Sequence, residues 1–232
     1  MQTPLQKYQD DLKGAEFSSD PAQKNAVQHM QQLYDDLLRQ YQRQGQGVLQ
    51  KIKSLFVRSD DRQLKGLYFW GGVGRGKTYL VDSFYECLPF DNKKRIHFHR
   101  FMQEVHRELK QLKNIESPLK IVADRLAGQI RVLCFDEFHV SDITDAMLLA
   151  GLLQALFERG VVLVTTSNQH PDDLYQGGVQ RERFLPAIAL LKEHTRVVNV
   201  DSGVDYRLQF LDHAEIYHSP LDERAELMLI DN

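Results

Sequence analysis

The chain has 232 residues, of which 42% are hydrophobic, with a formal net charge of -3 and a pI near 6.3. This length accommodates one large domain, or one domain with appendages, and the hydrophobic fraction is sufficient for a packed core. A weakly acidic chain is not expected to be a general nucleic-acid or membrane-surface binder, so any such partner would have to be met by a local patch.

The compartment is predicted from the cysteines and from the first residues. The two cysteines, Cys87 and Cys134, lack the spacing of metal ligands, so we expect free thiols in a reducing, cytoplasmic setting, with a buried disulfide as the alternative. Residues 1–14 hold no apolar stretch typical of a signal peptide, and no arginine precedes Arg39, in contrast to a mitochondrial presequence. No apolar run approaches membrane-spanning length.

An N-terminal helical segment with a linker, packed on the core, is predicted for residues 1–65. Residues 1–19 are polar and show no pattern, but a helix is expected to begin after Asp20, which can cap it. Pro21 suits the first turn, and Gln23 can reach back to the cap. Apolar residues then recur at helical spacing, which predicts one buried face.

A basic run follows that helix. Residues 39–65 carry seven basic side chains against Asp60 and Asp61. We expect a solvated linker surface here, with a binding site for a polyanion as the alternative.

From residue 66 to residue 200, apolar strands alternate with amphipathic helices. This alternation is typical of a parallel sheet with helices on both faces, so we predict a three-layer α/β core with five parallel strands. Residues 201–232 are expected to form a C-terminal extension. The predicted strands cover residues 67–70, 95–99, 132–135, 161–166 and 197–200, and the predicted helices begin at about residues 79, 101, 118, 142 and 183.

A phosphate-binding motif lies between the first strand and its helix. Residues 71–78 match the pattern G-x-x-x-x-G-K-[ST] at every fixed position, in the required order of strand, glycine-rich loop and helix. Backbone N–H groups of such a loop and the following helix N-terminus bind phosphates. The alternative is a turn that merely links strand to helix. The predicted nucleotide-binding residues are Gly71, Gly72, Val73, Gly74, Arg75, Gly76, Lys77, Thr78 and Tyr79.

Individual roles follow from the chemistry of phosphoryl transfer. Lys77 is expected to neutralise the outer phosphates, and the Thr78 hydroxyl is expected to coordinate Mg²⁺. Asp136 and Glu137 end the apolar strand that reaches Phe135. Asp136 is predicted to hold the Mg²⁺ through water, and Glu137 to polarise the attacking water. A strand that happens to end in surface acids is the alternative.

Two further positions complete the predicted catalytic set. Asn168 follows the next strand, and because parallel strands end at the same edge of a sheet, its amide is expected beside the γ-phosphate. Arg183, or as second choice Arg181, is predicted to reach the γ-phosphate of a neighbouring subunit. The alternative for Asn168 is an asparagine that only forms a turn. The alternative for the two arginines is that both are solvated and pair with Glu182.

This order of motifs resembles an AAA+ ATPase, and within that superfamily the bacterial cell-division ATPases of the ZapE type and their mitochondrial relatives. The resemblance covers residues 8–221 and is most specific at the stretches HFHRFM at 97–102 and RFLP at 183–186. It implies a P-loop NTPase core of the ASCE type, hydrolysis of Mg-ATP in a dynamic homo-oligomer, and the tubulin homologue FtsZ, or another polymeric protein, as partner. It also implies a cytoplasmic protein recruited to the division site to remodel the division ring.

One feature departs from the family, whose members continue into a helical lid with a second sensor arginine. Only 32 residues follow Val200 (232 minus 200), so we expect the lid to be missing or truncated and assign no second sensor.

Other functions are weighed against this one. A helicase-loader-like ATPase would use a basic patch at Lys93, Lys94 and Arg95, but the acidic net charge disfavours nucleic acid. A nucleotide switch that does not hydrolyse is a third candidate, and a phosphotransferase is the least favoured. Histidines 97, 99 and 106 are considered as a metal site and set aside, because no cysteine or carboxylate of suitable spacing joins them.

Overall fold

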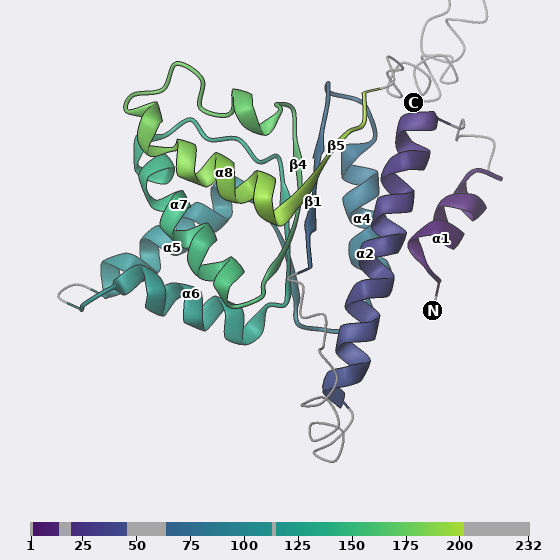
Figure 1. Ribbon diagram of the computed structural model, residues 1–232, viewed down its shortest axis with the longest axis horizontal. Helices are drawn as coiled ribbons and strands as arrows, with labels where there is room; N and C mark the ends of the chain where they lie inside the picture. Colours follow the sequence, from purple (N-terminus) through teal and green to yellow (C-terminus); the bar gives the residue numbers. More distant parts are fainter. Residues whose placement is uncertain (1, 14–19, 46–63, 113–114, 202–232) are drawn as a thin grey trace, which may run out of the picture.

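The computed structural model describes residues 2–13, 20–45, 64–112 and 115–201 (Figure 1). At its centre lies a parallel sheet of five strands in the order β2-β3-β4-β1-β5. This confirms the predicted five-stranded parallel sheet, with β4 between the strand of the phosphate loop and the acidic strand. The strands are β1 (Gly66–Trp70), β2 (Lys93–His97), β3 (Val132–Asp136), β4 (Val162–Ser167) and β5 (Thr195–Asn199).

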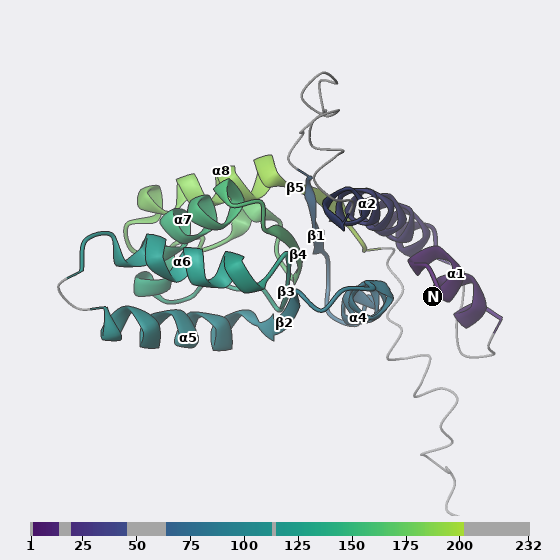
Figure 2. The same cartoon turned by 90° about the horizontal axis from the view of Figure 1, so that it is seen from below.

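Helices cover both faces of the sheet and complete three layers (Figures 1 and 2). Each face has its own apolar cluster, so the sheet lies between two cores. None of the helices among the described residues is long and apolar enough to span a membrane. One face carries α5 (Phe98–Gln111), α6 (Pro118–Gln129), α7 (Ile143–Glu158) and α8 (Leu185–His194), and the other carries α1 (Pro4–Asp11), α2 (Pro21–Gly45) and α4 (Lys77–Cys87).

Strand β3 shows how the two cores set the orientation of the site. All its residues are buried, as expected for a strand with helices on both faces. Phe135 belongs to the cluster under α5, where its ring centroid lies 4.7 Å from that of Phe101, whereas Cys134 belongs to the cluster under α4. Because side chains alternate along a strand, Asp136 shares the α4 side with Cys134.

Several element boundaries differ from the prediction by a few residues. The second strand ends at His97, two residues early, because Phe98 opens α5 and packs its ring 4.5 Å from that of Phe138 in the core. Arg181 and Arg183 lie in a short 3-10 turn, η2 (Arg181–Arg183), and the helix predicted from residue 183 begins at Leu185. The fifth strand starts two residues earlier than predicted, at Thr195.

Residues 1–19 show no pattern in the sequence, yet helix α1 forms within them, over Pro4–Asp11. Thr3 and Gln6 form a reciprocal cap that starts α1. Helix α1 then packs on α4, where the Tyr79 hydroxyl donates a hydrogen bond to the Asp11 carboxylate at 2.5 Å and Lys7 pairs with Glu86. The N-terminal segment thus braces the helix that follows the phosphate loop.

The expected helix start at Asp20 is present, but one cap contact differs. The Asp20 carboxylate accepts the N–H of Ala22 at 2.7 Å, as predicted for a cap. Gln23 points elsewhere: its side chain is buried, and its Nε2 lies 3.5 Å from the carbonyl oxygen of Arg75. Of the basic run at 39–65, residues 46–63 lie outside the described part, as do residues 202–232 of the C-terminal extension.

Candidate functional site

The phosphate loop connects β1 to α4 and is shaped by glycines in the left-handed region. Gly74 and Gly76 have φ angles of 82° and 75°. A Cβ atom at Gly76 would lie only 2.5 Å from Nε2 of Gln23, so the end of that glutamine side chain would have to shift. The loop therefore depends on glycine chiefly for its backbone conformation.

Lys77 begins α4 and folds back over the loop. Its Nζ donates hydrogen bonds to the carbonyl oxygens of Gly71 and Gly72, at 2.8 Å and 2.7 Å. Burial lowers the pKa of Lys77 below its ordinary value, and nearby Arg75 adds to this effect, while Asp201 and Glu137 oppose it. The ammonium is thus held over the loop by the backbone carbonyl oxygens of Gly71 and Gly72.

A cavity of about 360 Å³ opens beside the loop. On one side it is lined by loop residues 73–78, and on the other by residues from the ends of β3 and β4. Glu137 and Asn168 both line it, as the shared edge of parallel strands predicts. The remaining lining residues are Thr166 and Ser167.

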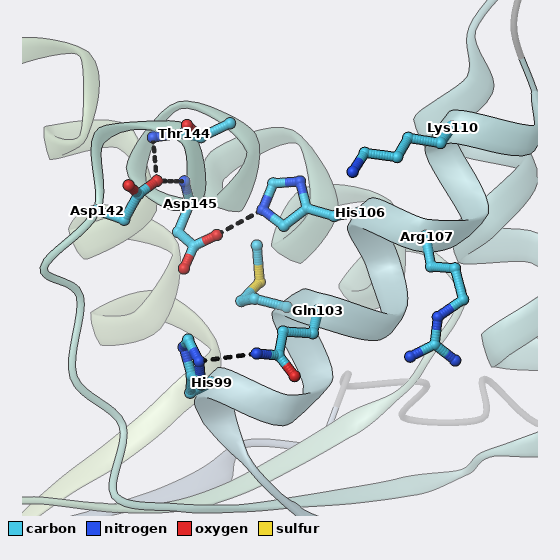
Figure 3. Close-up of a pocket in the computed structure, with 9 residues that line it drawn as sticks. His99, Gln103, His106, Arg107, Lys110, Asp142, Thr144 and Asp145 are labelled. Carbon is cyan, nitrogen blue, oxygen red and sulfur yellow. Dashed lines mark hydrogen bonds and ion pairs between the residues drawn. The ribbon is translucent and has the colours of Figure 1, made fainter.

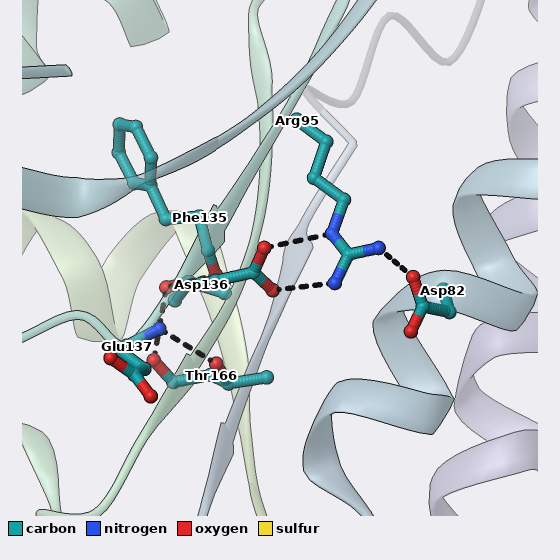
Figure 4. A network of polar contacts seen from close by, with 7 residues as sticks. Asp82, Arg95, Phe135, Asp136, Glu137 and Thr166 are labelled. Atoms are coloured by element: carbon teal, nitrogen blue, oxygen red, sulfur yellow. Dashed lines mark hydrogen bonds and ion pairs between the residues drawn. The ribbon is translucent and has the colours of Figure 1, made fainter. Parts of the chain in front are cut away.

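Glu137 reaches this cavity because the chain turns sharply at the end of β3. Its φ of 53° is left-handed, which costs a residue with a side chain about 1–2 kcal/mol. Its N–H donates to the Thr166 hydroxyl at 3.0 Å (Figure 4), and the next N–H, of Phe138, donates to the Thr166 carbonyl at 2.7 Å. These bonds to β4 hold the turn, so that Phe138 returns to the core while the Glu137 side chain remains at the cavity.

Asp136 has a different position from its neighbour. It is 7% exposed and does not line the cavity, and both its carboxylate oxygens accept hydrogen bonds from Arg95, at 2.8 Å and 3.0 Å (Figure 4). Thr78, in contrast, is exposed at the cavity. A hydroxyl and one carboxylate are oxygen donors of the kind that Mg²⁺ uses when phosphates and water supply the other ligands.

No cluster of three or more histidines, cysteines or acids able to hold a metal occurs among the described residues. The residues present therefore fit a metal that arrives with a nucleotide better than a metal held by protein alone. Of the histidines weighed as a metal site, His97 ends β2 while His99 lies on α5, so these two do not lie on one strand.

Asp201 is a residue of the site that the sequence interpretation missed. Its carboxylate accepts the N–H of Gly72 at 3.2 Å and pairs with Nε of Arg75 at 3.0 Å. The available signal was an acid two residues after the fifth strand, at the sheet edge that also carries the loop. Arg95 was treated only as part of a basic patch, so its contact with Asp136 was missed as well.

Neither predicted arginine lines the cavity of its own chain. Arg181 is partly buried, and its Nη2 donates to the backbone oxygen of Asp172 at 2.5 Å. Arg183 is exposed, while Phe184 behind it is fully buried and anchors the turn. The side chain of Arg183 is therefore the one presented outward. Tyr79 directs its hydroxyl to Asp11, which leaves only its backbone for a nucleotide.

Two more cavities continue along the same edge of the sheet. One of about 440 Å³ shares Glu137 and Asn168 with the nucleotide cavity and reaches His99. The next, of about 620 Å³, lies between α5 and the start of α7 and is also lined by His99 (Figure 3). There His106 Nε2 lies 2.6 Å from the Asp145 carboxylate, which ties the two helices together.

The basic patch at 93–95 is used inside the molecule. Lys93 Nζ donates to the backbone oxygens of Tyr85 and Leu88, and Lys94 pairs with Glu104 at 2.6 Å. Arg95 pairs with acids on two other elements. These contacts count against the patch as a nucleic-acid groove.

A protein-family model described as AFG1-like ATPase matches residues 2–230. Cell division protein ZapE of Escherichia coli K12 is 47% identical over 98% of this chain, which spans 62% of that protein's length. Lactation elevated protein 1 homolog B of Danio rerio is 41% identical over a stretch that covers 70% of this chain and 35% of the length of that protein.

Solved structures with similar folds include DNA-replication proteins. Domain III of the replication initiation protein DnaA of Thermotoga maritima superposes with a TM-score of 0.56, covering 94% of this chain and 79% of its own at 15% identity. The DnaC helicase loader superposes with a TM-score of 0.52, covering 80% and 93% at 14% identity. At these identities the likeness shows the fold alone, and it agrees with the predicted three-layer P-loop NTPase fold.

We expect Lys77→Ala to weaken nucleotide binding at least tenfold, because it removes the buried cation held over the loop. The measurement is titration with a fluorescent ATP analogue. Lys192→Ala is the control, since it also removes a lysine, but one on the surface that pairs with Asp172. Both of these residues are distant in sequence from the phosphate loop. Equal affinities for both variants and the unchanged protein would contradict the placement of the nucleotide at this loop.

Proposed function

The chain belongs to the AFG1-like ATPase family, and we propose that it binds Mg-ATP in the cavity beside residues 71–78 and hydrolyses it there. The observation that carries the proposal is the presence of Glu137 and Asn168 in that cavity, although they come from different strands. A glycine loop alone would bind phosphate. An acid and an amide facing the loop supply the groups that hydrolysis requires.

In the proposed reaction the phosphates lie against the backbone N–H groups of the loop, with Lys77 neutralising their charge. Thr78, and Asp136 through water, would hold Mg²⁺, which would supply neutralisation of the phosphate charge when bound. Asn168 orients a water molecule, and the Glu137 carboxylate takes the proton that this water loses as its oxygen attacks the γ-phosphorus. The bond from that phosphorus to the bridging oxygen breaks, leaving ADP and phosphate.

We propose that Arg183 of a neighbouring copy completes the site. Its exposure on a turn anchored by Phe184 supports action on another subunit, and Arg181 is the second choice because its guanidinium is already bound to Asp172. The chain would then hydrolyse ATP efficiently only as a homo-oligomer.

For the partner, we propose FtsZ or another polymeric protein of the division machinery, in the cytoplasm at the division site. Support comes from the 47% identity to a protein named for cell division. The output would be remodelling or destabilisation of the polymer. A loader-like role on nucleic acid is the second candidate, favoured only by the fold shared with DnaC, and the internal contacts of Lys93, Lys94 and Arg95 weigh against it.

Glu137→Gln should leave nucleotide affinity within about twofold but slow hydrolysis at least a hundredfold, because the amide cannot take the proton of the attacking water. ATP and ADP bound after a single turnover are separated and quantified. Glu193→Gln, which changes an exposed acid on α8, serves as the matched control. If ATP is cleaved at the normal rate by Glu137→Gln, the residue has no role as base.

The arginine proposal predicts complementation between two inactive variants. Arg183→Ala keeps a complete nucleotide cavity, and Lys77→Ala keeps the outward arginine, so a mixture should recover part of the activity that each lacks. Specific ATPase activity of the unchanged protein should also rise with its concentration. No recovery on mixing, together with a flat concentration series, would show that Arg183 does not act between subunits.

The partner proposal predicts that polymerised FtsZ raises the ATPase rate severalfold and that ATP shortens or disperses the polymers. Light scattering and phosphate release are followed in the same sample, with Glu137→Gln as the control that binds ATP without cleaving it. Stimulation by single-stranded DNA in place of FtsZ would favour the loader-like alternative.

A further inference from the structure

Arg95 lies at the centre of a polar network that joins three elements around the proposed nucleotide site (Figure 4). In the parallel pairing of β2 with β3, Arg95 lies opposite Cys134, and His97 lies opposite Asp136. Residues two apart on a strand share a face, so Arg95 and Asp136 project to the same side of the sheet, toward α4. The long arginine side chain spans the diagonal between them.

The contact between these two residues fixes the plane of the carboxylate. Nε and Nη2 of Arg95 donate to the two oxygens of Asp136 at 2.8 Å and 3.0 Å. Such two-point pairing matches the planar guanidinium to the planar carboxylate and restricts both rotamers. Lysine carries the same charge but cannot make this paired contact.

The remaining terminal nitrogen of Arg95 pairs with Asp82 on α4. Asp82 lies four residues after Thr78 on the same helix, so both side chains are on one face of α4. Arg95 therefore links the helix that carries the Thr78 hydroxyl to the strand that carries the Asp136 carboxylate. These are the two protein groups proposed to hold Mg²⁺.

Burial makes this arrangement hard to replace. The Asp136 side chain is only 10% exposed and that of Arg95 23%, whereas Asp82 is 41% exposed. A carboxylate removed from water in this way requires a charged or hydrogen-bonding partner, and Arg95 supplies one to each oxygen. Without it, Asp136 would have to reorient toward water or toward other donors.

We propose that Arg95 is a positioning residue for the metal-nucleotide complex: it orients the Asp136 carboxylate and, through Asp82, sets its distance from Thr78. The inference rests on the proposed function, since it concerns the same Mg-ATP. It assigns no contact between Arg95 and the nucleotide. As a consequence, Arg95 determines by how much Mg²⁺ increases the affinity for nucleotide. The phosphate loop and Lys77 determine the affinity for nucleotide in the absence of metal.

The experiment compares nucleotide affinity with and without metal in each variant. The probe is the non-hydrolysable analogue AMP-PNP with a methylanthraniloyl fluorophore, titrated in the presence of Mg²⁺ and again with EDTA. The ratio of the two dissociation constants is the gain from metal. We expect Arg95→Gln to reduce that gain about tenfold while leaving the EDTA affinity within about twofold, since partners that orient metal ligands have effects of this order.

Two further variants separate geometry from charge and from folding. Lys94→Gln removes a neighbouring charge on the same strand, whose partner Glu104 lies on α5, on the other face of the sheet. This variant should keep the full increase in nucleotide affinity that Mg²⁺ provides. Arg95→Lys keeps the charge but loses the two-point contact, so its thermal unfolding should stay near that of the unchanged protein while its gain still falls. Should Arg95→Gln fail to fold, Arg95→Lys decides the question.

Each outcome has one meaning. A full or increased gain in Arg95→Gln or Arg95→Lys would overturn the positioning role, and an increase would show that Arg95 withholds Asp136 from the metal. If the unchanged protein and Lys94→Gln gain nothing from Mg²⁺, the proposed Mg-ATP function itself fails and this inference fails with it. A reduced gain with normal EDTA affinity supports both.

Discussion

The parallel register of β1, β3 and β4 is the constraint on which the site depends. Because these strands run in one direction and lie side by side in the order β3-β4-β1, their carboxyl ends lie at one edge of the sheet. The glycine loop, the Asp136–Glu137 pair and Asn168 each follow one of these ends. The backbone pairing of the strands is thus enough to bring residues that are far apart in sequence to the same edge of the sheet. It does not require contacts between the side chains of the site.

The end of β3 then separates two neighbouring acids into different environments. Strand alternation sends Phe135 to one core and Asp136 to the other, where Arg95 binds it. The left-handed turn at Glu137 takes the next side chain out of this alternation and into the cavity. Regular extended backbone would have placed Glu137 against the α5 side, away from the phosphate loop. Local backbone strain at this residue is therefore what gives two adjacent carboxylates two different positions.

Sequence was informative where a signal is local. The loop at 71–78 and the buried strands β3 and β4 are continuous patterns, and their order sufficed for the fold and for placing Glu137 and Asn168 near the loop. Thr166 and Ser167 also line the cavity but were not predicted as residues of the site. Helix α1 has only eight residues, too few for a clear period, and its stability comes from contacts with α4 such as Tyr79 with Asp11. Arg95 and Asp201 were missed for a related reason, since their partners are known only once the strands are paired.

Charge in the cavity bears on the proposal that a second copy of the chain completes the site. Among the described residues that line it, Arg75 and Lys77 are the basic ones, and Arg75 already pairs with Asp201. Arg95, the next basic side chain nearby, is committed to Asp82 and Asp136. A triphosphate brings several negative charges, and hydrolysis moves them toward the leaving group. Lys77 alone would stabilise that shift of charge only weakly. The proposed contribution of Arg183 from a neighbouring copy would add a positive charge that the single chain lacks, because its own arginines near the cavity already pair with acids.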